Sequence, residues 1–264
     1  DDPEVAGYID VCGVQTVFID LESLGKQERQ GGMNTVISQH QRENIAPVKA
    51  ALTNARLLVR TNPLHPVSSN EVDYCIDAGA DMLMLPMFRS AVELEEFCEL
   101  VDGRVPVVPL VETVGALRDV EQIVQLGGVS ELHFGLNDLR VDIGLSFLFE
   151  VVSQSVLDEA TEICRTTGVP FGVGGISRVE GGLIPGRAVL GEYLRLGANG
   201  TILSRCFHQA AENLEDLKSK VDLKLEIEKL NTARMELLER SHSAVESDHV
   251  EFQRRIGEVV SARK

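Results

Sequence analysis

The 264-residue sequence contains few basic residues, and this shortage limits the partners that the protein can have. It has 25 Lys and Arg against 41 Asp and Glu, which gives a formal net charge of −16 at pH 7. Because like charges repel, we do not expect a chain with this balance to bind nucleic acid or an anionic membrane. A small anionic substrate remains compatible with it, since such a substrate needs only a local positive pocket.

Long apolar runs and paired cysteines are also missing. No apolar run approaches the roughly 20 residues that a membrane-spanning helix needs, and no signal peptide is visible at the start. The five cysteines are scattered, odd in number, and form no CxxC pair. This pattern is typical of free, buried thiols in a reducing compartment and not of disulfides or zinc ligands. We therefore expect a cytoplasmic protein without a membrane partner.

The apolar pattern predicts an α/β fold in which short strands alternate with helices. The predicted strands are 16–19, 56–59, 82–85, 105–111, 131–134, 170–173 and 201–203; the predicted helices are 3–12, 43–53, 70–78, 91–101, 116–124, 147–166 and 187–196. The chain opens on a helix, so we expect one more strand upstream. This alternation favours a (β/α)8 TIM barrel over an open doubly wound sheet. No GxGxxG motif follows a strand, which argues against dinucleotide binding.

The composition changes after residue 206. We expect residues 1–206 to form the barrel, with its first strand missing upstream, and residues 207–264 to form one or two added amphipathic helices. Apolar residues recur there at helical spacing among many charged ones, and an apolar helix face needs a partner. The partner is either the same subunit or a second copy in the homo-oligomer that we expect, and the pattern leaves both open.

Two carboxylates follow neighbouring strands in the middle of the chain. Glu112 follows the strand 105–111, and Asp138 follows the strand 131–134 after a short turn. A helix joins these strands, so they should lie parallel, about 5 Å apart, with both acids at the C-terminal edge of the sheet. Active sites of parallel α/β folds lie at that edge. We predict that Glu112 and Asp138 share Mg²⁺ or Mn²⁺, because oxygen ligands without a nearby His or Cys cluster suit these cations.

Each acid also has a simpler explanation when taken alone. Glu112 is compatible with an acid at a helix N-terminus, and Asp138 with a turn-forming Asp after glycine. A nearby cation supports the site instead: Arg60 ends an apolar strand, where a guanidinium is costly unless it faces an anion. We predict that Arg60 grips a substrate carboxylate. A salt bridge to Asp20 or Glu112 is the alternative.

Four motifs resemble those of the HpcH/HpaI aldolase and citrate lyase β-subunit family. They are RTNPL at 60–64, IDAGADMLMLP at 76–86, VPLVETVGAL at 108–117 and FGLNDLRVDIG at 134–144, in the family's order over residues 2–206. The resemblance implies a phosphoenolpyruvate/pyruvate-type TIM barrel with a divalent metal. It implies a carbon–carbon lyase of the aldolase type that acts through the enolate of a 2-oxo acid. An acyl-CoA lyase of the citryl- or malyl-CoA type is the alternative.

The resemblance also implies roles for individual residues. By this comparison Glu112 and Asp138 are the metal ligands, and Arg60 binds the carboxylate of the 2-oxo acid. Asp20 matches a strand-end acid of the family, and Asp77 matches the acid that orients a base in the aldolases. Gly135 and Asn137, from the last of the four motifs, are assigned to substrate binding.

Two positions depart from the family's pattern. Ser23 stands where the aldolases have a His, and Leu110 stands where they have a Gln. Serine cannot accept a proton near neutral pH, so the base must come from elsewhere. The long loop 23–41 is extra relative to the aldolases and carries Arg29, Asn34 and His40. We predict His40 as a catalytic residue, and a water molecule on the metal is the other candidate base.

Two further functions are compatible with the sequence. A barrel that has lost its base could serve in binding or assembly. The glycines at 172, 174, 175 and 200 follow the last strands, where many barrels bind phosphate, which keeps a phosphosugar isomerase as a rival. Room for helix–strand packing also explains these glycines.

Overall fold

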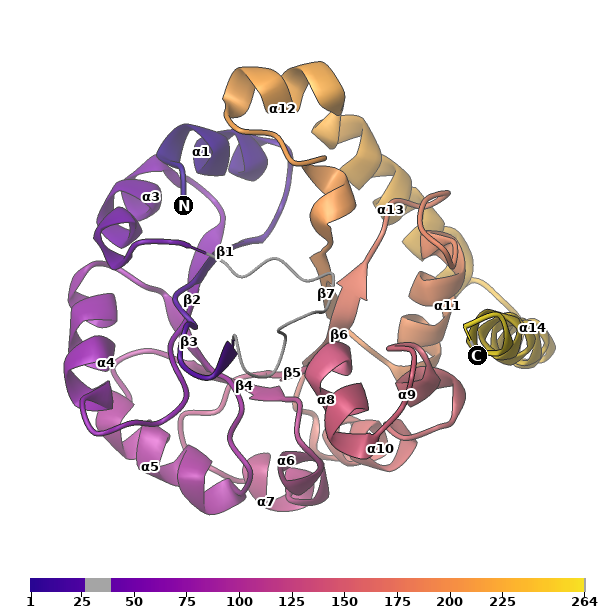
Figure 1. Ribbon diagram of the computed structural model, residues 1–264, viewed down its shortest axis with the longest axis horizontal. Coiled ribbons are helices and arrows are strands. Elements are labelled where there is room, and N and C mark those ends of the chain that lie inside the picture. The colour runs from indigo at the N-terminus through magenta and orange to yellow at the C-terminus, as the bar shows by residue number, and fades with distance from the viewer. Residues whose placement is uncertain (27–38, 264) are drawn as a thin grey trace.

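In the computed structural model, which describes residues 1–26 and 39–263, parallel strands form one curled sheet in chain order. Figure 1 shows the sheet inside a ring of helices. The strands are β1 Thr16–Asp20, β2 Arg56–Arg60, β3 Met82–Leu85, β4 Val107–Val111, β5 Leu132–Phe134, β6 Phe171–Ile176 and β7 Gly200–Leu203. All of the predicted strands are therefore confirmed. In the described residues β1 and β7 are the edges of a seven-stranded sheet, so the predicted eight-stranded closure is not observed.

The helices lie outside the sheet, and most of them connect one strand to the next. They are α1 Pro3–Val11, α3 Ile45–Ala51, α4 Ser68–Asp77, α5 Ala91–Val101, α6 Val114–Arg118, α7 Val120–Ile123, α8 Leu136–Ile143, α9 Glu150–Ser153, α10 Asp158–Thr167, α11 Gly186–Leu196, α12 Leu214–Lys220, α13 Leu223–Leu238 and α14 His242–Ser261, with 3-10 helices η1 Arg42–Asn44 and η2 Arg205–Phe207. Because the strands are parallel, each connecting helix runs back from the C-terminal edge of the sheet to the N-terminal edge.

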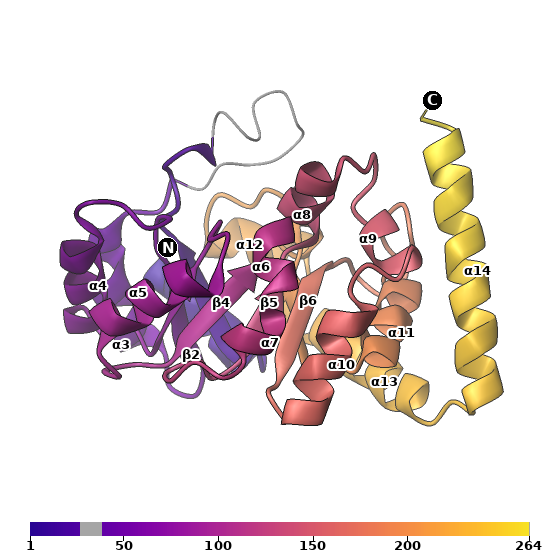
Figure 2. The same ribbon diagram turned by 90° about the horizontal axis from the view of Figure 1, so that it is seen from below.

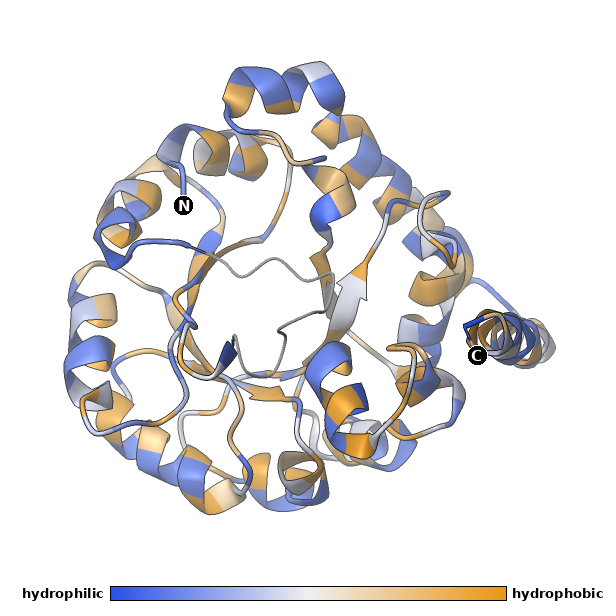
Figure 3. Cartoon of the chain, viewed as in Figure 1, coloured by the Kyte–Doolittle hydropathy of each residue, from blue (hydrophilic) through white to orange (hydrophobic). Residues whose placement is uncertain are grey.

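The core has two parts because successive strand residues point to opposite faces of the sheet. Leu57 and Val59 belong to the large cluster that packs between sheet and helices. Leu58, between them, belongs to a smaller cluster with Met84 and Leu110 from β3 and β4. Figure 3 shows these hydrophobic strands inside helices that carry both hydrophobic and hydrophilic residues. Sheet register is therefore fixed on both faces.

Two helix predictions and one turn prediction need correction. The predicted helix 116–124 is divided into α6 and α7 at Asp119, whose backbone leaves the helical region with φ of −92° and ψ of 8°. Its carboxylate accepts a hydrogen bond from the Ala91 N–H. The predicted helix 147–166 is divided into α9 and α10, and Ser155 between them has a left-handed backbone with φ of 58°. The residues after Gly135 were predicted as a turn, but they form α8.

The C-terminal residues form three helices and not one or two. Helix α13 packs on α11, α14 packs on α9 and α11, and α12 contacts α1. Figures 1 and 2 show α12 and α13 beside the other helices of the ring and α14 outside it. Buried residues of α13 and α14 belong to the same large cluster as the strands. The tail thus packs on its own subunit; the division after residue 206 and the homo-oligomer stay predictions.

Two expectations from the composition concern the cysteines and membrane-spanning helices, and both can be compared with the structure. All five cysteines are free, and three of them are buried. None of the helices in residues 1–26 and 39–263 combines the length and the apolar character needed to span a membrane.

Candidate metal and substrate site

Charged residues gather at the C-terminal edge of the sheet. Asp20 and Arg60 are the last residues of β1 and β2, and the register places them opposite each other. Glu112 directly follows β4, and Gly135 directly follows the neighbouring strand β5. The parallel topology therefore brings side chains from distant parts of the sequence to one end of the sheet.

The environment of Glu112 holds its carboxylate in one place. Its side chain is 3% exposed, and Oε1 accepts a hydrogen bond of 3.1 Å from the Met87 N–H. Gly135 donates its N–H to the Val111 carbonyl oxygen at 3.0 Å and lies against Glu112. A Cβ atom at position 135 would come within 2.8 Å of Glu112 Cβ and Oε2. Only glycine fits there without displacing Glu112.

Asp138 lies in the first turn of α8, close enough for its charge to act on Glu112. Burial, reinforced by the charge of Asp138, raises the pKa of Glu112 to about 8. The carboxyl of Glu112 therefore holds a proton near neutral pH unless another positive charge compensates for it. A divalent cation is such a charge, and two carboxylates are the hard oxygen ligands that Mg²⁺ and Mn²⁺ prefer. The pair fits the predicted metal.

The described part of the chain offers this metal few other ligands. No group of three or more His, Cys, Asp or Glu side chains in residues 1–26 and 39–263 is arranged to hold a metal ion. A cation bound by Glu112 and Asp138 would therefore keep several positions for water and substrate, because Mg²⁺ takes six ligands in an octahedron.

Arg60 is held by Asp20 through two parallel hydrogen bonds. Arg60 Nε lies 2.8 Å from Asp20 Oδ1, and one Nη atom lies 2.7 Å from Asp20 Oδ2. Burial alone would raise the pKa of Asp20, but hydrogen bonds from Arg60 and Lys26 outweigh it and lower that pKa below its ordinary value. The salt bridge named above as an alternative is thus present. It occupies one edge of the guanidinium, and no hydrogen bond or ion pair to the other Nη atom is found among residues 1–26 and 39–263.

Two more charged residues complete the cluster around Asp20. Lys26 is 3% exposed, and its Nζ lies 2.7 Å from Asp20 Oδ2. Glu22 is 2% exposed, and its Oε2 lies 3.4 Å from both Lys26 Nζ and an Arg60 Nη atom. Neither residue was predicted as part of the site, and nothing in the local sequence pattern marks Lys26.

His40, predicted as a catalytic residue, lies beside Asp20. Its Nδ1 accepts a hydrogen bond of 3.1 Å from the Asp20 N–H, which requires an unprotonated Nδ1. Burial lowers the pKa of His40 to about 4, so the ring is neutral at pH 7 and carries its proton on Nε2. In this tautomer His40 can donate a hydrogen bond or proton from Nε2 but is a poor base.

Much of the predicted loop 23–41, including Arg29 and Asn34, lies outside the described residues. Its first residues are anchored to the loop after β2: the N–H groups of Ser23 and Leu24 donate to Asn62 Oδ1 at 2.9 and 3.0 Å. Asn62 in turn donates to Glu71, which also pairs with His65 at 3.1 Å. Ser23 therefore supports the loop.

The remaining predicted residues fall in two places. Asn137 lies next to Asp138 in α8, and its Oδ1 accepts a hydrogen bond of 3.3 Å from Arg140. Asp77 is the last residue of α4 and is exposed. Because α4 runs back from the end of β2 towards the start of β3, Asp77 lies at the opposite edge of the sheet from Arg60. Our prediction that Asp77 orients a base has no support in this geometry.

The glycines of β6 serve close packing. A Cβ atom at Gly172 would lie 2.4 Å from His133 Nδ1, and one at Gly174 would lie 2.6 Å from the Tyr193 hydroxyl. His133 is buried and donates from Nε2 to the Gly174 carbonyl oxygen at 3.1 Å. These contacts favour packing over phosphate binding as the reason for these two glycines.

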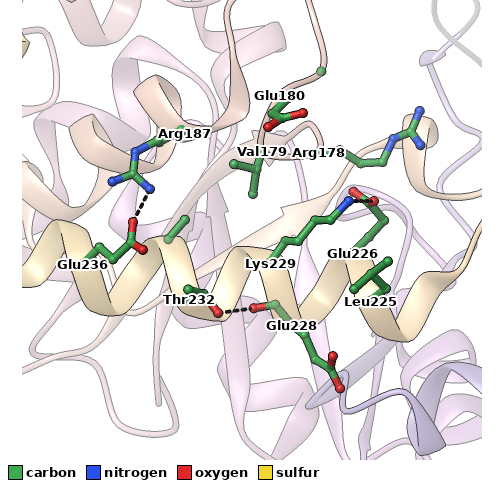
Figure 4. Close-up of a pocket in the computed structure, with 12 residues that line it drawn as sticks. Arg178, Val179, Glu180, Arg187, Leu225, Glu226, Glu228, Lys229, Thr232 and Glu236 are labelled. Carbon is green, nitrogen blue, oxygen red and sulfur yellow. Dashed lines mark hydrogen bonds and ion pairs between the residues drawn. The ribbon is translucent and has the colours of Figure 1, made fainter.

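A separate groove of about 690 Å³ lies between the loop after β6 and α13. Figure 4 shows two ion pairs among the charged residues that line it. Arg187 contacts Glu236 at 2.6 Å, and Lys229 contacts Glu226 at 2.7 Å. Neither Glu112 nor Asp138 lines this groove. The candidate site is therefore the strand-end cluster.

The contact between Gly135 and Glu112 gives a first prediction. Gly135→Ala should displace the Glu112 carboxylate and weaken Mg²⁺ binding about tenfold or more, because metal ligands depend on their supporting neighbours. Titration calorimetry measures this effect. Gly257→Ala in α14, where a Cβ atom meets nothing within 4 Å, is the control and should bind Mg²⁺ as the wild type does. Unchanged Mg²⁺ affinity in both variants would show that Glu112 is not a metal ligand.

The fold is a parallel α/β sheet, and the candidate site consists of acidic side chains at its C-terminal edge. The family model for HpcH/HpaI aldolase/citrate lyase matches residues 1–181. The chain belongs to this family, as its motifs predicted. The family comprises aldolases and lyases that generally use a divalent metal, which supports a lyase-type enzyme. No curated protein sequence matches the chain.

Solved structures show a similar fold. The HpcH/HpaI aldolase from Desulfitobacterium hafniense DCB-2 is 18% identical, with a TM-score of 0.58 over 77% of this chain and 82% of that one. A family protein from Burkholderia cenocepacia J2315 is 16% identical, with a TM-score of 0.60 over 89% and 90%. Citrate synthase SbnG is 17% identical, with a TM-score of 0.56 over 76% and 81%. At these identities the similarity shows the fold alone.

Proposed function

We propose that the protein is a carbon–carbon lyase of the aldolase type that acts on a 2-oxo acid and requires Mg²⁺ or Mn²⁺. The observation that carries this proposal is the meeting of Glu112, Asp138 and Arg60 at one edge of the sheet. Two carboxylates suit a divalent cation, and a guanidinium suits a carboxylate. A 2-oxo acid presents both a chelating oxygen pair and a carboxylate.

Each residue has a distinct role in this proposal. Glu112 and Asp138 would hold the cation, which when bound would polarise the 2-oxo group and stabilise the negative charge of the enolate. Arg60 binds the substrate carboxylate through the guanidinium edge that Asp20 leaves open. Asp20 fixes the orientation of Arg60. Gly135 leaves room for Glu112, and Asn137 is kept as a substrate contact.

The test of this function is proton exchange at the methyl group of pyruvate in deuterated water, followed by NMR with Mg²⁺ present. An enolate-forming enzyme exchanges these protons even without its second substrate. Exchange that needs the metal and is inhibited by oxalate would support the lyase. If no exchange occurs with metal bound and several 2-oxo acids tried, the result favours a barrel that has lost catalysis and serves in binding or assembly.

An acyl-CoA lyase is the second candidate, because the matching family description includes citrate lyase. It uses the same cation and differs in forming its enolate from a thioester. Exchange at the methyl group of acetyl-CoA, with none at pyruvate, would select this candidate over the first.

We expect His40→Ala to slow pyruvate exchange roughly tenfold without abolishing it, because it removes a hydrogen-bond donor and not the base. Mg²⁺ affinity should stay the same. His242→Ala, in an exposed part of the tail, is the control and should have no effect. Exchange that falls below detection in His40→Ala alone would identify His40 as the base and contradict the tautomer inferred from its contact with Asp20.

We also propose that the sheet closes as a (β/α)8 barrel through an eighth strand between β1 and β7. The parallel edges of β1 and β7 support this proposal, and so does the packing of α12 beside α1. In this arrangement residues 1–206 supply β1 to β7, the eighth strand is additional to them, and residues 207–264 add helices to the barrel. The homo-oligomer also remains a proposal, which the molar mass in light scattering would test.

A further inference from the structure

The guanidinium of Arg60 lies over the aromatic ring of Phe18. The Arg60 Cζ atom is 5.4 Å from the centre of this ring, which is within the range of a cation–π contact. Phe18 and Asp20 are two residues apart in β1, so their side chains point to the same face of the sheet. Arg60, opposite Asp20 in β2, therefore meets both of these residues.

Apolar packing holds the Phe18 ring in place. The ring packs against the smaller apolar cluster, which includes Leu58, Met84 and Leu110. Leu58 is also the partner of Phe18 in the register of β1 and β2, and it lies two residues before Arg60. Neighbouring strands thus fix the ring, and the ring supports Arg60 from a side that carries no charge.

This support adds to what Asp20 does. The two hydrogen bonds from Arg60 to Asp20 hold one edge of the guanidinium. Hydrogen-bond directions at a carboxylate oxygen are broadly distributed, so the guanidinium plane can still tilt about that edge. Recognition of a second carboxylate depends on donors in a fixed plane. A ring in contact with the guanidinium restrains the tilt and therefore favours this recognition.

We propose that Phe18 is a positioning residue that holds the guanidinium of Arg60 in the orientation that binds the carboxylate of the 2-oxo acid. This inference rests on the proposed function, because it assumes that Arg60 binds the substrate. Phe18 acts through Arg60, by attraction between the negative face of its ring and the guanidinium charge. The role needs no contact between Phe18 and the substrate or metal.

The test compares Phe18→Leu with a protein that carries trifluorophenylalanine at position 18 alone. The fluorinated ring keeps its apolar shape, but the fluorine atoms withdraw charge from its face and weaken a cation–π contact. Oxalate is titrated into protein saturated with Mg²⁺. We expect Phe18→Leu to weaken oxalate binding about fivefold, and the fluorinated ring to weaken it about threefold, as the loss of a partly buried cation–π contact would.

Three controls separate this effect from a loss of packing. Mg²⁺ affinity should stay within about twofold of the wild type, because neither change alters a carboxylate. Trifluorophenylalanine at position 97, where the native ring of Phe97 is buried in the large cluster, should leave oxalate binding unchanged. Tyr8→Leu removes a ring that lies 4.8 Å from Lys218 Nζ, in α1 and away from the strand ends, and should also leave oxalate binding unchanged. Thermal unfolding shows which proteins are folded, and the fluorinated protein decides alone if Phe18→Leu does not fold.

The outcomes separate this inference from the function on which it rests. Weaker oxalate binding in both Phe18→Leu and the fluorinated protein supports the role of Phe18. Full oxalate binding by the fluorinated protein, with weaker binding in Phe18→Leu, overturns it, because the ring then serves packing alone. Full binding in both overturns it as well and leaves the lyase intact. A wild type that binds Mg²⁺ but neither oxalate nor a 2-oxo acid rejects the proposed function and this inference with it.

Discussion

Glu112→Gln and Asp138→Asn should each weaken Mg²⁺ binding by roughly a hundredfold, because each removes one of only two protein carboxylates at the proposed metal site. The fold should persist, since the buried carboxylate of Glu112 costs stability when it is not compensated. Titration calorimetry with Mg²⁺ and Mn²⁺ measures the loss, and circular dichroism checks the fold. Glu121→Gln, an exposed change on α7, is the control. Full metal affinity in both site variants would show that Glu112 and Asp138 are not the metal ligands.

The pH dependence of metal binding follows from the same pair. Burial and the charge of Asp138 raise the pKa of Glu112 to about 8, so a metal must displace a proton below that pH. Mg²⁺ affinity should therefore rise with pH, by up to about tenfold per unit, and level off above pH 8. The dependence should disappear in Glu112→Gln, which has no proton to lose. Wild-type affinity that stays constant between pH 6 and 8 would mean that Glu112 is not a ligand.

The strands were the most predictable part of the fold. Short apolar runs such as 82–85 are buried on both faces in a parallel sheet, so each run directly predicts a strand. The breaks within helices were not predictable in the same way. Asp119 and Ser155 leave the helical backbone region, and apolar spacing continues across both positions.

The site was predictable where the topology alone fixes the position of a residue. Glu112 and Arg60 end strands, and parallel strands end at one edge. Lys26 reaches the site through an irregular turn, so no spacing marks it. Asp77 shows the opposite case: a motif match suggested a role, but its place at the end of α4 puts it at the other edge of the sheet.

Arg60→Lys should reduce pyruvate exchange and oxalate affinity by about a hundredfold while Mg²⁺ binding stays close to that of the wild type. Lysine keeps the charge but has one nitrogen in place of the planar fork. In the wild type, Nε and one Nη atom bind Asp20, and the proposed function assigns the other Nη atom to the substrate. A lysine held by Asp20 and Glu22 cannot present a second, rigidly placed donor to a substrate carboxylate.

Arg56→Lys is the matched control, because Arg56 begins the strand that Arg60 ends. Arg56 is exposed and contacts Glu131 at 3.5 Å, a pair of the kind that contributes little. This variant should therefore exchange pyruvate protons as fast as the wild type. Thermal unfolding of both variants separates lost folding from lost binding.

The comparison decides between the two explanations for Arg60. If Arg60 serves only as the salt-bridge partner of Asp20, Arg60→Lys should lower the unfolding temperature while the folded protein keeps its exchange rate. If Arg60 binds the substrate, exchange and oxalate affinity should fall together at a temperature where the variant is fully folded. Asp20→Asn adds an independent check, because it frees Arg60 without removing it. It should weaken oxalate binding less than Arg60→Lys does, since the guanidinium fork is still there to meet the carboxylate.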